Sequence, residues 1–78
     1  MNKLITVFGA SWCQPCAQLK GALSTAGVEF DSLDIDENLD IARANNVRSV
    51  PTTLIQDGDA THVVIGNKLK EIMGYINA

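Results

Sequence analysis

Apolar and polar positions along the first half of the chain alternate between short continuous runs and helical spacing. Residues 4–8 form an apolar, β-branched run that ends at Gly9, which predicts a strand covered on both faces. From Pro15 onward apolar residues recur on one helix face, and Gly27 is a natural stop just beyond them. Residues 28–35 read as a second strand, and a helical crossover between two strands favours parallel pairing.

The second half of the chain predicts a short helix, a hairpin and a final helix. Asp36-Glu37 suits the start of the short helix, which should fade at Asn45-Asn46. The β-rich runs 52–56 and 60–65 flank Asp57-Gly58, a strong hairpin signal. Asn67 is placed to cap the last helix, whose apolar positions are Leu69, Ile72, Met73 and Ile76. The expected order is β-α-β-α-β-β-α, an α/β fold with a four-stranded mixed sheet flanked by helices.

Size and charge narrow the class of protein. A chain of 78 residues with 46% hydrophobic and 19% charged residues fits one globular domain, expected over 1–78. The net charge is −3 and the six Lys and Arg are scattered, so no basic stripe favours nucleic acid. No apolar stretch has the length of a membrane span. Cleavage after a signal peptide near Ala10 would delete the first strand, so we expect a soluble, cytoplasmic protein.

The only two cysteines, Cys13 and Cys16, lie between the first strand and the first helix. A disulfide between them closes a very short loop, so the unfolded-state entropy that it removes stabilises the fold by only about 2 kcal/mol, against about 3 kcal/mol for a fifteen-residue loop. Stabilisation alone therefore explains the pair poorly. Residues three apart on a helix are close enough for a disulfide to open and close with little backbone movement. The spacing predicts a redox-active dithiol.

The two sulfurs should differ in reactivity. Cys13 is expected just before the first helical turn, where unpaired N–H groups and the helix dipole favour a thiolate. Cys16 belongs to the buried helix face and should keep its proton longer. These positions assign Cys13 as the exposed attacking sulfur and Cys16 as the resolving one. Pro15 fits the first turn between them without loss of a helical hydrogen bond, and the chemistry needs neither a metal nor a bound organic cofactor.

Residues 12–16, Trp-Cys-Gln-Pro-Cys, resemble the thioredoxin pattern Trp-Cys-x-Pro-Cys, and residues 48–52, Arg-Ser-Val-Pro-Thr, supply a second signature of that superfamily. The order of elements resembles the minimal thioredoxin-like fold over nearly the whole chain. The resemblance implies that Pro51 is cis and faces the dithiol, with Val50 pairing to a substrate segment. The residues expected to contact substrate are Trp12, Pro15, Val50, Pro51, Ile65 and Gly66.

The chain departs from the thioredoxin pattern at two positions. Thioredoxins usually carry a buried Asp six residues before the attacking cysteine, and Val7 occupies that position. The lysine that pairs with that Asp maps to Ser32. We therefore expect slow ionisation of Cys16, through water or Asp34.

The expected partners follow from the same resemblance. The lack of the first strand and helix of full-length thioredoxins resembles small glutaredoxins, including glutaredoxin-like donors to ribonucleotide reductase. Glutathione-using glutaredoxins usually carry Gly-Gly and an acidic residue before the last helix, whereas this chain has Ile65-Gly66-Asn67. We expect a monomer that reduces disulfide-containing protein substrates and takes electrons from a thioredoxin-reductase-type flavoenzyme, with ribonucleotide reductase as a further possible partner.

The same residues are compatible with other kinds of site. The two cysteines could form half of a structural zinc site, but a closed site needs four ligands and the chain offers only His62 beyond them. His62 is expected to be an ordinary surface or packing histidine on an edge strand. Two alternative functions remain open: a glutaredoxin-like donor to ribonucleotide reductase, and a non-catalytic thioredoxin-like module whose dithiol senses redox state.

Overall fold

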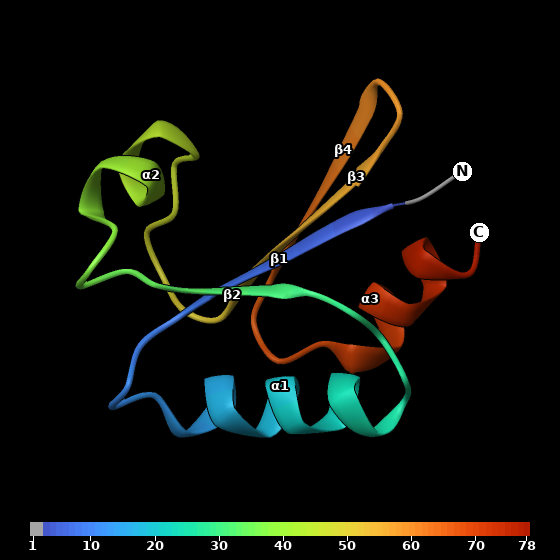
Figure 1. Cartoon of the computed structure of the whole chain (residues 1–78), viewed down its shortest axis with the longest axis horizontal. Coiled ribbons are helices and arrows are strands. Elements are labelled where there is room, and N and C mark those ends of the chain that lie inside the picture. Colours follow the sequence, from blue (N-terminus) through green and yellow to red (C-terminus); the bar gives the residue numbers. More distant parts are fainter. Residues whose placement is uncertain (1–2) are drawn as a thin grey trace.

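The computed structural model describes residues 3–78, so the first two residues of the expected 1–78 domain lie outside the described part. Four strands and three helices follow one another in the expected order (Figure 1). Their bounds are β1 Leu4–Gly9, α1 Gln14–Thr25, β2 Asp31–Asp34, α2 Leu39–Ala44, β3 Thr52–Asp57, β4 Ala60–Ile65 and α3 Leu69–Ile76.

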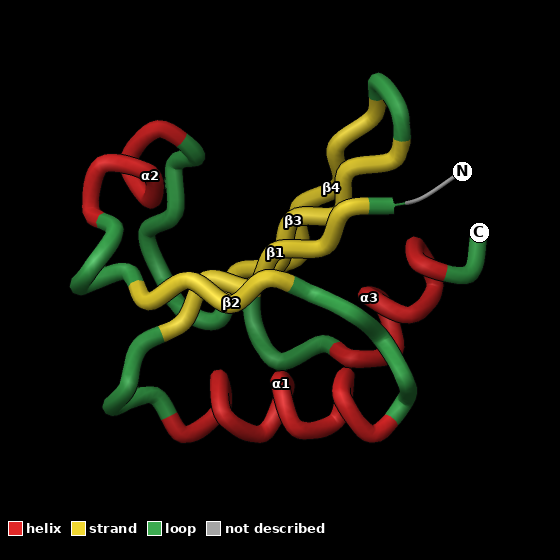
Figure 2. Tube along the Cα trace, in the orientation of Figure 1, coloured by secondary structure: helices red, strands yellow, loops and turns green. Residues whose placement is uncertain are grey.

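The four strands form one mixed sheet in the order β2-β1-β3-β4 (Figure 2). The strands β1 and β2 are parallel, as the helical crossover between them predicts. The pairs β1–β3 and β3–β4 are antiparallel, and Phe8 lies between Leu33 on β2 and Thr52 on β3. The fold class, the mixed sheet and the central position of the first strand are confirmed.

Helices cover the two faces of the sheet unequally, with α1 and α3 on one face and α2 on the other (Figure 1). The larger core lies under α1 and α3, and its buried members are Ile5, Val7, Leu19, Leu23, Ile55, Val64 and Ile72. The smaller core, under α2, consists of Phe8, Ala42 and Leu54. Alternation of side chains along each strand separates these two sets.

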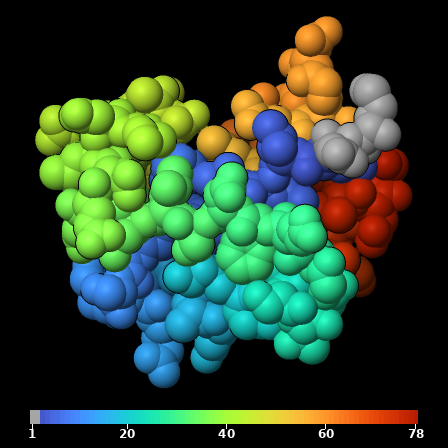
Figure 3. All heavy atoms as spheres, viewed as in Figure 1, coloured from blue at the N-terminus to red at the C-terminus, as the bar shows by residue number. Residues whose placement is uncertain are grey.

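The face that carries α2 is covered only in part. Figure 3 shows α2 and the tip of the β3–β4 hairpin as separate projections with a hollow between them. Leu4 is 62% exposed and Val63 is 52% exposed. Apolar side chains of the sheet therefore reach solvent beyond the end of α2.

The second strand is shorter than the predicted 28–35, and the end of α1 gives the reason. Gly27, with φ 79°, lets the chain turn back so that its N–H donates to Ser24 O and the Val28 N–H donates to Leu23 O. This pair of bonds is a Schellman motif. Because the backbone of Val28 is hydrogen-bonded to the end of α1, the strand begins only at Asp31, opposite Thr6.

The second helix begins at Leu39, three residues after the predicted start. The Asp36 N–H donates to Asp34 Oδ1 over 2.8 Å and the Glu37 N–H donates to Asp34 O over 3.1 Å. Asn38 precedes the helix, but its side-chain amide donates back to the same carbonyl. Asp34 therefore holds the chain in a turn where the sequence suggests a helix start.

Two further boundaries move by one residue. Asp57 pairs with Ala60, so the hairpin loop is Gly58-Asp59, and Gly58 has the positive φ that the first position of a two-residue turn requires. Lys68 rather than Asn67 precedes α3, because the Lys68 N–H still closes a turn on Gly66 O. Within residues 3–78 no helix is long and apolar enough to cross a membrane.

Candidate active site

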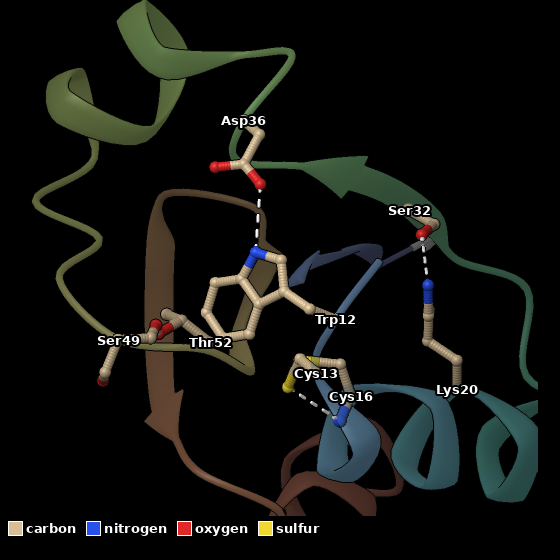
Figure 4. The surroundings of a disulfide bond; sticks show 8 residues. All are labelled: Trp12, Cys13, Cys16, Lys20, Ser32, Asp36, Ser49 and Thr52. Carbon is tan, nitrogen blue, oxygen red and sulfur yellow. Dashed lines mark hydrogen bonds between the residues drawn. A yellow bond between two sulfur atoms is a disulfide. The ribbon is translucent and has the colours of Figure 1, made fainter. Parts of the chain in front are cut away.

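The cysteine pair lies at the N-terminus of α1 (Figure 4). Cys13 is the N-cap residue, with the extended backbone angles φ −94° and ψ 106°. Its Sγ accepts a hydrogen bond of 3.1 Å from the backbone N–H of Cys16. The two residues are joined by a disulfide with a Cα–Cα distance of 5.3 Å. The sulfur of Cys13 thus takes the place of the oxygen that usually caps a helix.

Both cysteines are buried, which corrects part of the prediction. Cys16 is fully buried, as expected, but Cys13 is only 7% exposed rather than open to solvent. The disulfide folds Cys13 onto a small apolar cluster with Ala10, against which Ile35 and Val50 pack. Close packing continues beneath Cys16, because a Cβ built on Gly9 would lie 3.2 Å from the Cβ of Cys16.

The proline signature lies against the disulfide cluster. The Val50–Pro51 peptide bond is cis, as the resemblance implies, and Val50 packs on the cysteines. The Thr52 hydroxyl donates to Ser49 O over 2.7 Å within the same loop. The Gly66 N–H donates to Pro51 O over 2.8 Å, which brings the third predicted contact loop to the same end of the sheet.

The other predicted contact residues are open to solvent. Trp12 is 68% exposed and Ile65 is 59% exposed, while Gly66 is half-buried. Pro15 lies exposed in the first turn of α1, where its missing N–H breaks no helical bond. The structure therefore gathers all eight predicted site residues at one end of the sheet, and their roles stay predictions.

Sequence analysis missed the partner of Trp12. The indole Nε1–H donates to Asp36 Oδ2 over 3.1 Å, and Figure 4 shows the ring between this carboxylate and the disulfide. In the sequence, Asp36-Glu37 suggested only the start of the short helix. Asp36 lies near the dithiol because β1 and β2 are parallel neighbours, so that their C-terminal ends lie together.

The two positions that depart from the thioredoxin pattern are neighbours across β1 and β2. Val7 is fully buried and pairs with Ser32. Lys20, on α1, donates from Nζ to the Ser32 hydroxyl over 3.2 Å (Figure 4). The carboxylate of Asp34, which we considered as a group that deprotonates Cys16, accepts instead from the Asp36 N–H.

His62 and the metal interpretation can be placed in the same way. His62 is half-buried on the edge strand β4 and stacks on Tyr75 of α3, with ring centroids 4.3 Å apart. This contact confirms a packing histidine. Within residues 3–78 no group of three or more His, Cys, Asp or Glu side chains is placed to hold a metal ion.

Comparison with known proteins gives consistent matches over the whole chain. The thioredoxin family pattern matches residues 1–78. Thioredoxin H2 of Arabidopsis thaliana is 38% identical over 78 aligned residues, which cover 91% of this chain and 59% of the relative. Thioredoxin of Mycoplasma pneumoniae is 38% identical over 71 residues, covering 83% of this chain and 70% of the relative.

The solved structures agree with the sequence relatives. Oxidised mitochondrial thioredoxin 3 of Saccharomyces cerevisiae superimposes with a TM-score of 0.80 at 30% identity, over 96% of this chain and 76% of the yeast chain. The present chain thus spans 59% to 76% of the length of these three proteins. The matched family, the cysteine motif at the helix start and the shared fold together establish that the chain belongs to the thioredoxin family.

Proposed function

We propose that the chain is a thiol-disulfide oxidoreductase that reduces disulfides in protein substrates through Cys13 and Cys16. The observation that carries this proposal is the backbone N–H of Cys16 directed at the Cys13 sulfur at the start of α1. A helix N-terminus stabilises negative charge, so it lowers the pKa of the Cys13 thiol in the reduced protein below its usual value of about 8.5. The fully buried Cys16 keeps its proton longer.

The proposed reaction has two exchange steps. In the first, the Cys13 thiolate attacks one sulfur of the substrate disulfide, a mixed disulfide forms, and the other substrate sulfur leaves as a thiolate and takes up a proton. In the second, Cys16 gives its proton to water and its thiolate attacks the Cys13 sulfur, so that the Cys13–Cys16 bond forms and the substrate's remaining sulfur leaves as a thiolate that also takes up a proton from water. The substrate gains two electrons and two protons, and the protein becomes the disulfide seen here.

Substrate binding is proposed for the surface around the disulfide. Trp12 and Ile65 offer exposed apolar area on either side, and Val50 and Pro51 lie between them. A substrate segment in extended form would pair with the backbone of Val50 and place its disulfide over Cys13. Mixed apolar and backbone contacts suit many sequences, which fits a general reductant of proteins.

The electron source is proposed to be a thioredoxin-reductase-type flavoenzyme. The chain has a single glycine, Gly66, where glutathione-using glutaredoxins carry Gly-Gly and an acidic residue, so the glutathione route is less favoured. A reducing compartment such as the cytoplasm suits a dithiol that must return to its reduced form after each cycle. Ribonucleotide reductase as an electron acceptor stays a prediction.

The test is the reduction of insulin disulfides by the purified chain with NADPH and thioredoxin reductase. We expect turnover with the wild type and loss of more than about a hundredfold in Cys13→Ser, because the attacking thiolate is gone. Ser24→Ala, at an exposed position on the far end of α1, is the matched control and should keep full activity. A wild type without turnover, or a Cys13→Ser variant that equals it, would support the non-catalytic module instead.

A further inference from the structure

The core beneath α1 contains one polar atom that the proposed site does not yet use. Thr53 is fully buried, and among the described residues its Oγ1 has no hydrogen-bond partner. Thr52, its neighbour, satisfies its own hydroxyl by donating to Ser49 O. A buried hydroxyl without a partner destabilises the folded state, and such groups are rare in native proteins. Stability alone therefore does not explain a threonine at this position.

The strand register places Thr53 beside Val7, the position where thioredoxins usually carry a buried Asp. Thr53 on β3 pairs directly with Val7 on β1, and directly paired residues point to the same face of the sheet. On its other side Thr53 pairs with Val64 of β4. Its hydroxyl thus interrupts a row of apolar side chains that lies under α1 and α3.

The same register places Thr53 close to Cys16. Gly9 is two residues from Val7 on β1 and so lies on the same face, and it contacts Cys16 from below. Thr53 is the diagonal neighbour of Gly9 on β3, a relation that corresponds to about 7–8 Å between Cα atoms. Cys16 and Thr53 therefore occupy adjacent positions in one buried layer between the sheet and α1.

We propose that the Thr53 hydroxyl donates a hydrogen bond to the sulfur of Cys16 once the disulfide has opened, and so stabilises the Cys16 thiolate that resolves the mixed disulfide. This inference rests on the proposed reductase function. In the oxidised protein the Thr53 hydroxyl makes no hydrogen bond to the Cys16 sulfur, whose position is fixed by the bond to Cys13. In the mixed disulfide the proton of Cys16 leaves to water, and the hydroxyl offers the donor that an anionic sulfur in an apolar layer requires.

The charged side chains near Cys16 and Thr53 are not placed to stabilise a Cys16 thiolate. The first strand carries no charged residue between Lys3 and the cysteines. The ammonium of Lys20 is bound to Ser32, and Asp34 is bound to the backbone of the following turn. Other charged groups on the loops at this end of the sheet are Asp36, which accepts from Trp12, and Glu37, Arg48 and Lys68, which are exposed. Cys13 itself is the other titrating group in direct contact, and its thiolate opposes a second charge on Cys16.

The test replaces only the hydroxyl, in the variant Thr53→Val. The two side chains have nearly the same shape, so the strand and the core should remain. We expect the pKa of Cys16 to rise by about one unit, measured from the ¹³Cβ shift of labelled cysteine in the reduced full chain across pH. The resolving step, followed as release of a stable mixed disulfide at neutral pH, should slow by about threefold, since a tenfold loss of thiolate is partly offset by the greater nucleophilicity of a thiolate with a higher pKa.

The oxidised variant should also unfold at a higher denaturant concentration than the wild type, because an unpartnered buried hydroxyl has been removed. Thr6→Val is the matched control: Thr6 pairs with Leu54 and points to the opposite face of the sheet. It should leave the pKa of Cys16 and the resolving rate unchanged. A Thr53→Val variant with wild-type pKa and rate would overturn the inference, even with increased stability, while a wild type without insulin turnover would refute the proposed function itself.

Discussion

At the scale of single residues, the site depends on what each sulfur touches. Cys13 receives a backbone N–H at the helix start, and Cys16 lies fully buried above Gly9. The difference arises from their places on the helix, since both residues have the same chemistry. Val7 is apolar where thioredoxins usually carry an acid, and the buried hydroxyl of Thr53 is paired with Val7 on the same face of the sheet.

The buried position of Val7 leads to a prediction about the rate of disulfide reduction. Val7→Asp should increase turnover in insulin reduction by about tenfold, less than a well-placed general base provides, because the surroundings were not built for it. The reason is that a carboxylate there can accept the proton of Cys16. Equal rates in the two proteins would contradict the role we assign to the missing acid.

The same variant should lose stability in a pH-dependent way. Burial raises the pKa of the new carboxyl in the folded state above its unfolded value of about 3.9. A group with a raised folded pKa loses its contribution to stability as pH rises. The variant should therefore already be less stable than the wild type near pH 3, because a polar carboxyl replaces buried Val7, and should lose a further ~3 kcal/mol by pH 8. Urea unfolding at several pH values measures this, with the wild type as reference.

At the scale of elements, the helix ends show what sequence patterns can and cannot predict. The spacing of apolar residues identified the strands and helices correctly, because an element that is buried on one or two faces carries apolar residues at regular intervals in the sequence. The predicted starts of β2 and α2 were each three residues too early. Their ends are set by hydrogen bonds such as Val28 N–H to Leu23 O and Asn38 to Asp34 O, which depend on geometry rather than on residue type.

Two further residues, Asp36 and Thr53, could not be linked to the site from the sequence for a similar reason. The cysteine and proline signatures are local in sequence, so they could be found there. The roles of Asp36 and Thr53 depend on which strands are neighbours and on which face each side chain lies. A threonine at an inward position of a strand buried on both faces was the available signal for Thr53.

The C-terminal helix offers a prediction about element stability. The ammonium of Lys3 donates to three oxygens at the end of α3, those of Tyr75, Ile76 and Ala78, over 2.8–2.9 Å. It also lies 3.9 Å from the carboxylate of Asp57. Lys3→Met should therefore lower the free energy of unfolding by about 1–2 kcal/mol, because a cation at a helix C-terminus and its hydrogen bonds are both lost.

The control for this variant is Lys70→Met on the same helix. Lys70 is exposed, and its replacement should change stability by less than about 0.5 kcal/mol. Urea titration monitored by circular dichroism compares both variants with the wild type. An equal effect of the two substitutions would contradict the bridging role of Lys3.

At the scale of the whole molecule, the mixed sheet assembles the site from segments far apart in the sequence. The loop after β1 carries the disulfide, the loop before β3 carries Pro51, and the loop after β4 adds Gly66, all at one end of the sheet. The opposite end holds the Lys3 contacts with α3. The dithiol and the contacts that hold the last helix in place thus lie at opposite ends of the sheet.

The central claim is that the helix start and burial divide the two sulfurs into an attacking and a resolving one. The direct measurement is alkylation of the reduced full chain with limiting iodoacetamide at pH 7, with each cysteine followed by peptide mass spectrometry. We predict that Cys13 is labelled at least about tenfold faster than Cys16, and that the pKa of the Cys13 thiol lies below about 8.5. Equal, slow labelling of both cysteines would contradict the account.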